Sequence, residues 1–222
     1  MKTIVAKTLT AVAILLPAKL YSQGFVNFNF EQATVTQADP PLTSYIYASG
    51  AVPGWSCYIG GVPQSIIGYN TVSLGGASIF LTDINSDGLS PLQGAYSVLL
   101  EGSWFGTPTA ASIGQVGQIP LDAVSLLFYL SLDSNLQVSF DDQIIPLIQI
   151  DSTANYVIMG GDISPFAGQT GQLLFTALPN GGYGMFDNIQ FSNIPVPEPG
   201  TWSLLALGVT LMGFSRLTRR KL

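Results

Sequence analysis

Apolar and polar residues alternate with a period of two over several stretches in the middle of the chain. These stretches lie at residues 26–30, 96–100, 124–132, 136–140 and 173–177. Successive side chains of a β-strand point to opposite faces, so this period is typical of strands with one buried face. No segment of comparable length has the 3.6-residue period of an amphipathic helix. The pattern predicts a mainly β structure.

Clusters of Gly, Pro, Asn and Asp separate these stretches and predict tight turns. The clusters are Pro40–Pro41, Pro53–Gly54, Gly60–Gly61, Gly75–Gly76, Ser86–Gly88, Gly160–Gly161 and Pro179–Gly182. Many short strands joined by such turns favour an all-β fold, an antiparallel β-sandwich or jelly roll. We expect residues 23–193 to form this domain, since no change of composition divides them.

The first 22 residues have the order of a secretory signal peptide. Lys2 and Lys7 precede an apolar run from Leu9 to Leu16, and Pro17 and small or polar residues follow. The run is too short to span a bilayer. Residues 1–22 are therefore predicted to form a signal helix that is removed on export.

The last 29 residues, 194–222, have a different organisation. A proline-rich linker, Ile194–Gly200, is expected to be extended and exposed. An uncharged apolar run follows up to Ser215, and then come four basic residues: Arg216, Arg219, Arg220 and Lys221. An apolar run with a basic end predicts a transmembrane helix whose cations stay in the cytoplasm.

Charge is distributed unevenly along the chain. All 7 Lys and Arg residues lie in the two terminal segments, whereas the 13 Asp and Glu residues lie between Leu20 and Ser215. Between Leu20 and Ser215 there is no basic residue, and the whole chain has no His. Binding of a phosphate backbone needs Lys or Arg, so nucleic acid and anionic lipid are excluded as partners of the body.

The same absences argue against catalysis. A Ser nucleophile would have neither His nor Lys as its base. Asp141 and Asp142 are adjacent and do not predict a glycosidase pair across a cleft. The chain is interpreted as non-enzymatic, with a secreted hydrolase as a remaining alternative. The single Cys57 is either a buried thiol or a site of intermolecular pairing.

Three aromatic residues next to predicted turns are candidates for sugar binding: Trp55, Trp104 and Tyr183. The apolar face of a sugar ring stacks on a flat aromatic surface. The alternative for each is a place in the core. Glu31 and Asp187 lie beside aromatic strand residues, where structural hydrogen bonding is the expected role.

Asp83, Asn85 and Asp87, followed by Gly88, match the first half of a calcium-binding loop. The second half is missing, because Gly94 stands where a bidentate Glu is needed. Two interpretations remain, a structural Ca²⁺ ion or an Asx-type turn without metal. No other cofactor is indicated.

The sequence Pro197-Glu198-Pro199, the apolar run and the basic end together resemble the PEP-CTERM sorting signal of Gram-negative bacteria. The resemblance implies an exosortase of the inner membrane as a partner. It also implies transient membrane attachment through the tail, followed by transfer of the body to the cell surface or extracellular matrix. A plain membrane anchor that is never processed is the alternative.

The segments 160–175 and 182–191 look like the closing strands of jelly-roll domains found ahead of PEP-CTERM tails. Phe30–Glu31 and Pro53–Trp55 are also similar to features of those domains. They resemble galactose-binding-like carbohydrate modules, which implies binding of carbohydrate or exopolysaccharide. A structural matrix or adhesion component, bridged by divalent cations, is the alternative.

Overall fold

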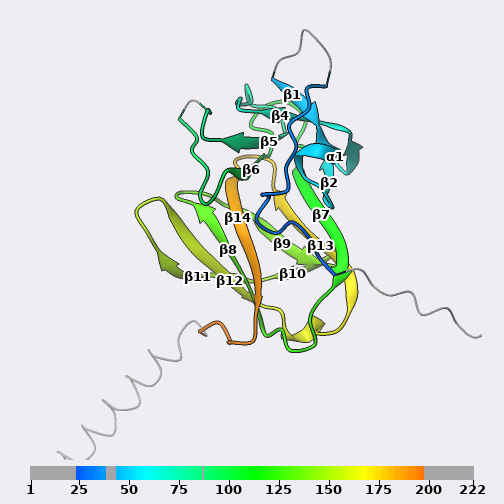
Figure 1. The fold of residues 1–222 in the computed structure, drawn as a ribbon, viewed down its shortest axis with the longest axis vertical. Coiled ribbons are helices and arrows are strands. Elements are labelled where there is room, and N and C mark those ends of the chain that lie inside the picture. The colour runs from blue at the N-terminus through cyan, green and yellow to red at the C-terminus, as the bar shows by residue number, and fades with distance from the viewer. Residues whose placement is uncertain (1–23, 39–43, 87, 198–222) are drawn as a thin grey trace, which may run out of the picture.

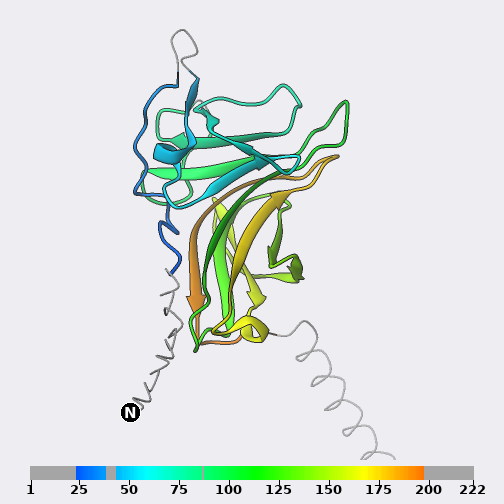
Figure 2. The ribbon, with the colours of Figure 1, turned by 90° about the vertical axis from the view of Figure 1, so that its right-hand side faces the viewer.

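The computed structural model describes residues 24–38, 44–86 and 88–197, which form two facing β-sheets (Figures 1 and 2). The eight-stranded sheet contains, in spatial order, β1 (Tyr45–Tyr47), β4 (Ile66–Tyr69), β5 (Ser78–Asp83), β6 (Tyr96–Glu101), β14 (Tyr183–Ser192), β8 (Ser125–Ser131), β12 (Tyr156–Asp162) and β11 (Leu147–Ser152). The six-stranded sheet contains β10 (Gln143–Ile145), β9 (Gln137–Phe140), β13 (Thr170–Ala177), β7 (Ala111–Gln118), β2 (Ser56–Ile59) and β3 (Val62–Gln64).

The prediction of an all-β antiparallel sandwich is confirmed. Neighbouring strands pair antiparallel throughout, except that β4 and β5 are parallel. The helices among the described residues are one turn each, α1 (Ala48–Ala51) and the 3₁₀ turn η1 (Ser164–Phe166). None of the described helices is long and apolar enough to cross a membrane. The expected signal helix (1–22) and transmembrane helix lie outside the described residues.

Aromatic side chains join the two sheets in the core. Phe175 of β13 stacks on Phe186 of β14, with ring centroids 4.7 Å apart and an interplanar angle of 12°. The Phe175 ring also meets Phe128 and Trp55 at steep angles. These rings alternate along their strands with side chains on the other face, because inward positions recur every second residue.

The period-two pattern located several of these strands correctly. The strands β6, β8, β9 and β13 lie on predicted segments, and the predicted inward residues Leu126, Phe128 and Leu130 of β8 are buried. The strand predicted at residues 26–30 is wrong. Asn27 and Phe30 have φ of 53° and 56°, a left-handed conformation that ends an extended strand.

The turn predicted at Gly160–Gly161 is also wrong, because both glycines lie inside β12. Their role is close packing. A Cβ atom on Gly161 would lie 2.5 Å from a side-chain carbon of Ile145, and one on Gly160 would lie 2.7 Å from a side-chain carbon of Val196. Gly in a strand interior often marks such a close approach of another segment.

Removing the central ring should test this core. Phe175 has no exposed surface, so Phe175→Ala leaves a cavity between the sheets and should lower the free energy of unfolding by about 3–5 kcal/mol. Phe105 is 77% exposed, so Phe105→Ala should cost about 1 kcal/mol or less. Urea unfolding followed by tryptophan fluorescence measures both, and equal losses would contradict the assigned core.

Candidate functional site

Three strands of the eight-stranded sheet bring Ser78, Glu101 and Tyr183 into one row. Glu101 of β6 lies opposite Ser78 of β5 on one side and opposite Tyr183 of β14 on the other. Directly paired residues of neighbouring strands point to the same face of a sheet. The next row on this outer face is Phe80, Leu99 and Met185, which pack together. The polar row therefore stands at the edge of an apolar patch.

Trp104 lies at this row, although it belongs to the loop between β6 and β7. Its backbone N–H donates to the carbonyl of Gly75 at 2.9 Å, and its side chain lies close enough to Glu101 to lower the pKa of that carboxyl group. The Ser78 hydroxyl, also beside Glu101, donates to the carbonyl of Gly76 at 3.2 Å. The side chain remains 52% exposed. An aromatic face and a carboxylate acceptor are thus presented together.

Burial affects both ionisable groups of the row. Desolvation raises the pKa of Glu101 above its usual value, while the hydrogen bonds from Trp104 and Ser78 oppose this shift. Desolvation also raises the pKa of Tyr183, and the negative charge of Glu101 adds to the shift. The tyrosine therefore keeps its hydroxyl proton at neutral pH and can donate it in a hydrogen bond.

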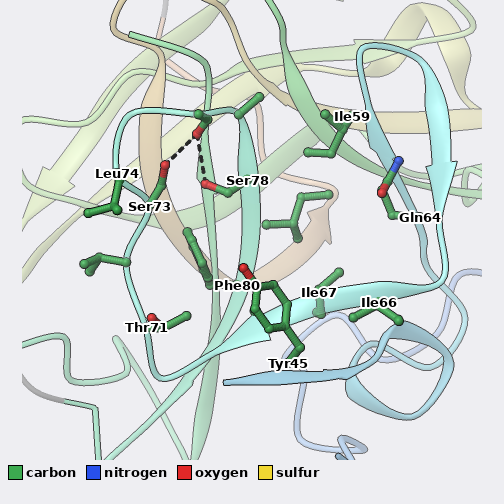
Figure 3. A pocket seen from close by; sticks show the side chains of 15 residues that line it. Tyr45, Ile59, Gln64, Ile66, Ile67, Thr71, Ser73, Leu74, Ser78 and Phe80 are labelled. Carbon is green, nitrogen blue, oxygen red and sulfur yellow. Dashed lines mark hydrogen bonds between the residues drawn. The ribbon is translucent and has the colours of Figure 1, made fainter. Parts of the chain in front are cut away.

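A cavity of about 480 Å³ adjoins the row and shares Ser78 with it (Figure 3). Its walls include Tyr45 of β1, Ile66 of β4 and Phe80 of β5, while Gln64 of β3 stands on the far side. Leu74, on the loop before β5, is 98% exposed. No acid or base is among the residues that line this cavity.

Two loops are fixed to each other beside the site. Gly75 has φ of +98°, and a Cβ atom there would lie 2.6 Å from the Phe105 ring. The Ser73 hydroxyl donates to the carbonyl of Gly76 at 2.7 Å and accepts from the N–H of Gly75 at 2.9 Å. These contacts hold the loop before β5 against the loop that carries Trp104 and Phe105.

The structure separates the three aromatic candidates. Trp104 and Tyr183, which are 79 positions apart in the chain, meet at Glu101. Trp55 is only 6% exposed, and its indole N–H donates to the carbonyl of Asn27 at 3.1 Å. Trp55 is therefore a core residue and cannot present a ring face to a sugar. Sequence reasoning missed Glu101 and Ser78, whose pairing depends on strand register.

The candidate calcium segment forms an Asx-type turn. The backbone N–H of Asn85 donates to Asp83 at 2.8 Å, and the Asp83 carboxylate also accepts from Tyr69, Asn70 and the Asn85 amide. Burial raises the pKa of Asp83, but these donors outweigh it and lower the pKa overall. A cation would have to displace them. Asp87 lies outside the described residues.

Glu31 and Asp187 hold the loop between β5 and β6 on the outer face of the sheet. Glu31 accepts from the N–H groups of Ala95 and Tyr96 at 2.8 and 3.2 Å. Asp187, with no exposed surface, accepts from the Ser97 hydroxyl at 2.7 Å. Burial raises the pKa of Asp187 to about 7, against the effect of its hydrogen bonds. The expected structural role of both residues is supported by these contacts.

The single cysteine and the adjacent pair of aspartates have structural roles. Cys57 is buried, and desolvation raises the pKa of its thiol to about 12, so it is an unreactive apolar residue. Asp141 and Asp142, with φ of 43° and 63°, form the two-residue turn between β9 and β10. They face no cleft.

The tail was compared with known protein families. The model of the PEP-CTERM protein-sorting motif matches residues 195–221. The chain ends in a PEP-CTERM sorting motif. This motif marks an exported protein that is sorted to the cell surface. Of its central residues, Pro197 is described, whereas Glu198, Pro199 and the basic residues Arg216, Arg219, Arg220 and Lys221 lie outside the described residues.

The fold is similar to that of several solved structures. A cyclase from Fischerella sp. TAU is 14% identical, with a TM-score of 0.43, over 80% of this chain and 98% of that chain. A family 11 carbohydrate-binding module from Clostridium thermocellum, in complex with a beta-1,3-1,4-mixed-linked tetrasaccharide, is 15% identical, with a TM-score of 0.36, over 70% and 97%. TmCBM61, in complex with beta-1,4-galactotriose, is 12% identical, with a TM-score of 0.35, over 77% and 99%.

The last two of these structures are carbohydrate-binding modules. At these identities the likeness concerns the arrangement of strands and not the ligand. Among curated proteins, no sequence matches this chain.

The buried carboxyl of Asp187 should make stability depend on pH. The folded state binds this proton more tightly than the unfolded state, whose carboxyl has a pKa near 3.8. Stability from this group is present at low pH and is lost as pH rises through about 7. Between pH 5 and pH 8 the free energy of unfolding should fall by about 2–3 kcal/mol from this group.

Urea unfolding at the two pH values measures this slope. Asp187→Asn should flatten it, whereas Asp122→Asn, a change at an exposed loop position, should leave it as in the unsubstituted protein. The two variants are compared by the change in their free energy of unfolding between the two pH values, and not by its absolute value. An unchanged slope in Asp187→Asn would refute the assignment.

Proposed function

We propose that this exported surface protein is a non-catalytic module that binds an extracellular polysaccharide through Trp104, Glu101 and Tyr183. The observation that carries the proposal is that Tyr183, paired with Glu101 across β14 and β6, and the exposed Trp104 both lie beside one carboxylate. Each element of the site has a role in sugar recognition. The exposed Trp104 face stacks on a sugar ring, Glu101 accepts hydrogen bonds from hydroxyl groups, and Tyr183 donates one.

The cavity next to Ser78 extends this site along the sheet edge. Its volume of about 480 Å³ is within the usual range for ligand pockets, and its lining mixes apolar side chains with Gln64, Thr71 and Ser73. A sugar chain combines apolar C–H faces with hydroxyl groups, so a mixed lining suits it. We assign the cavity to the sugar units of the polysaccharide that precede or follow the unit stacked on Trp104.

The charge of the body selects the class of polysaccharide. Between Leu20 and Ser215 the chain has no Lys or Arg, and the site itself contains the carboxylate of Glu101. An acidic polymer would be repelled, since no cation is present to pair with it. The proposed ligand is therefore a neutral glycan.

The sorting motif supports a ligand outside the cytoplasm. A protein recognised by an exosortase and delivered to the surface meets exopolysaccharide rather than cytoplasmic metabolites. A structural matrix component without a ligand is the alternative that the following tests distinguish.

Substitution of the proposed stacking residue should abolish glycan binding. Trp104→Ala removes the exposed ring, and loss of one aromatic platform should weaken affinity at least tenfold. Tyr156→Ala removes a ring from the other end of the eight-stranded sheet and should bind as the unsubstituted protein does. A panel of immobilised neutral glycans, with isothermal titration of those that bind, measures the difference.

If the unsubstituted protein binds no neutral glycan, with or without calcium, the result contradicts the proposal and favours the matrix alternative. Equal weakening by Trp104→Ala and Tyr156→Ala would place the ligand elsewhere on the body.

The carboxylate should contribute through its charge-assisted hydrogen bonds. Glu101→Gln keeps the size of the side chain but replaces one acceptor oxygen by a donor amide, so affinity should fall about three- to tenfold. Glu31→Gln is the matched control, since Glu31 holds the loop between β5 and β6. Titration with the same glycan measures both affinities. An unchanged affinity of Glu101→Gln would show that Glu101 does not contact the ligand.

A further inference from the structure

The start of the sorting motif packs against the body. After β14 the chain turns at the lower end of the sandwich (Figure 1). The Ser125 hydroxyl donates to the carbonyl of Ile194 at 2.7 Å, and the N–H of Ile194 donates to the Ser192 hydroxyl at 3.0 Å. Ile194 is 70% exposed, but Val196 two residues later is half-buried. The linker was expected to be exposed throughout, and Val196 departs from that expectation.

The strand register leaves a space on the sheet that the Val196 side chain fills. Gly160 of β12 pairs with Leu127 of β8 on one side and with Ile148 of β11 on the other. Glycine in the middle of this row leaves a notch between two apolar side chains. A Cβ atom on Gly160 would lie 2.7 Å from a methyl carbon of Val196, so the valine fills the space that a side chain at 160 would take.

The notch continues into an apolar groove of about 400 Å³. The groove is lined by residues of β10, of the start of β11 and of η1, including Ile144, Ile148 and Phe166, and by Val196 and Pro197 themselves. Pro197 is also the first residue of Pro197-Glu198-Pro199. The body thus contacts the sorting motif within its matched range, 195–221.

We propose that this groove is a docking site in cis for Val196 and Pro197, and that the body thereby controls presentation of its own sorting motif. A protein that reads Pro197-Glu198-Pro199 needs extended backbone with free sides. The groove contacts Pro197, the first residue of that motif, while Val196 is docked. Release of Val196 exposes its apolar surface to water, so the docked state is favoured in the folded body.

Thiol labelling of the full-length chain tests the docking. Val196→Cys and Ile194→Cys place a thiol at a docked and at an exposed position two residues apart. Labelling of each site is followed by mass spectrometry, which distinguishes it from buried Cys57. The thiol at 196 should react about five- to tenfold more slowly, as burial of one small apolar side chain predicts. In urea the two rates should become equal.

A change on the body side separates docking from local sequence effects. Ile148→Ala removes one wall of the groove and leaves the sorting motif unchanged, so the thiol at 196 should then react within about twofold of the thiol at 194. Ile66→Ala, a matched change in the other cavity, should preserve the difference. Equal rates for positions 194 and 196 in the folded, otherwise unsubstituted chain would overturn the docking.

The role in presentation is tested in cells that process the tail. Ile148→Ala should speed conversion of the full-length chain to the shortened form about two- to fivefold, while Ile66→Ala should not. The readout is the ratio of the two forms in a pulse-chase experiment. Equal rates for Ile148→Ala and the unsubstituted chain, or a tail retained in every variant, overturn the role in presentation. Neither readout depends on glycan binding.

Discussion

The structure is constrained by the absence of cations from the body. Between Leu20 and Ser215 no Lys, Arg or His is available, so a buried carboxylate can be satisfied by neutral donors alone. Asp83 receives donors from three residues, and these lower its pKa despite its partial burial. Asp187 lies deeper, so desolvation outweighs its hydrogen bonds and its pKa rises. Among the described residues no buried side-chain polar atom lacks a hydrogen-bond partner.

Stability must then come from apolar packing and backbone hydrogen bonds, because ion pairs are unavailable to the body. The period-two pattern identified strands such as β8 and β13 because their burial alternates over most of their length. It failed at residues 26–30, where Phe30 reaches the core from a left-handed turn rather than from a strand. It also failed at Gly160, since a glycine at a turn and a glycine beneath another segment look the same in one sequence.

The sequence predicted two aromatic residues of the candidate site, but it did not predict which residues pair with them across the strands. Trp104 and Tyr183 stand beside turn residues, which identified them as exposed aromatics. Glu101 gave no local signal, because its position between Ser78 and Tyr183 follows from the register of three strands distant in sequence. Trp55 shows the converse error. Its Pro-Gly turn suggested exposure, but the ring packs between the sheets.

One strand connects the two functional regions. Tyr183 is the first residue of β14 and belongs to the proposed glycan site, while Ser192 is its last and leads directly to the sorting segment. Ten extended residues span about 30 Å, so the site and the tail leave the body at opposite ends of this strand. The proposed glycan site and the start of the sorting segment therefore lie about one strand length apart, so that a ligand bound at Trp104 would leave the residues after Ser192 uncovered.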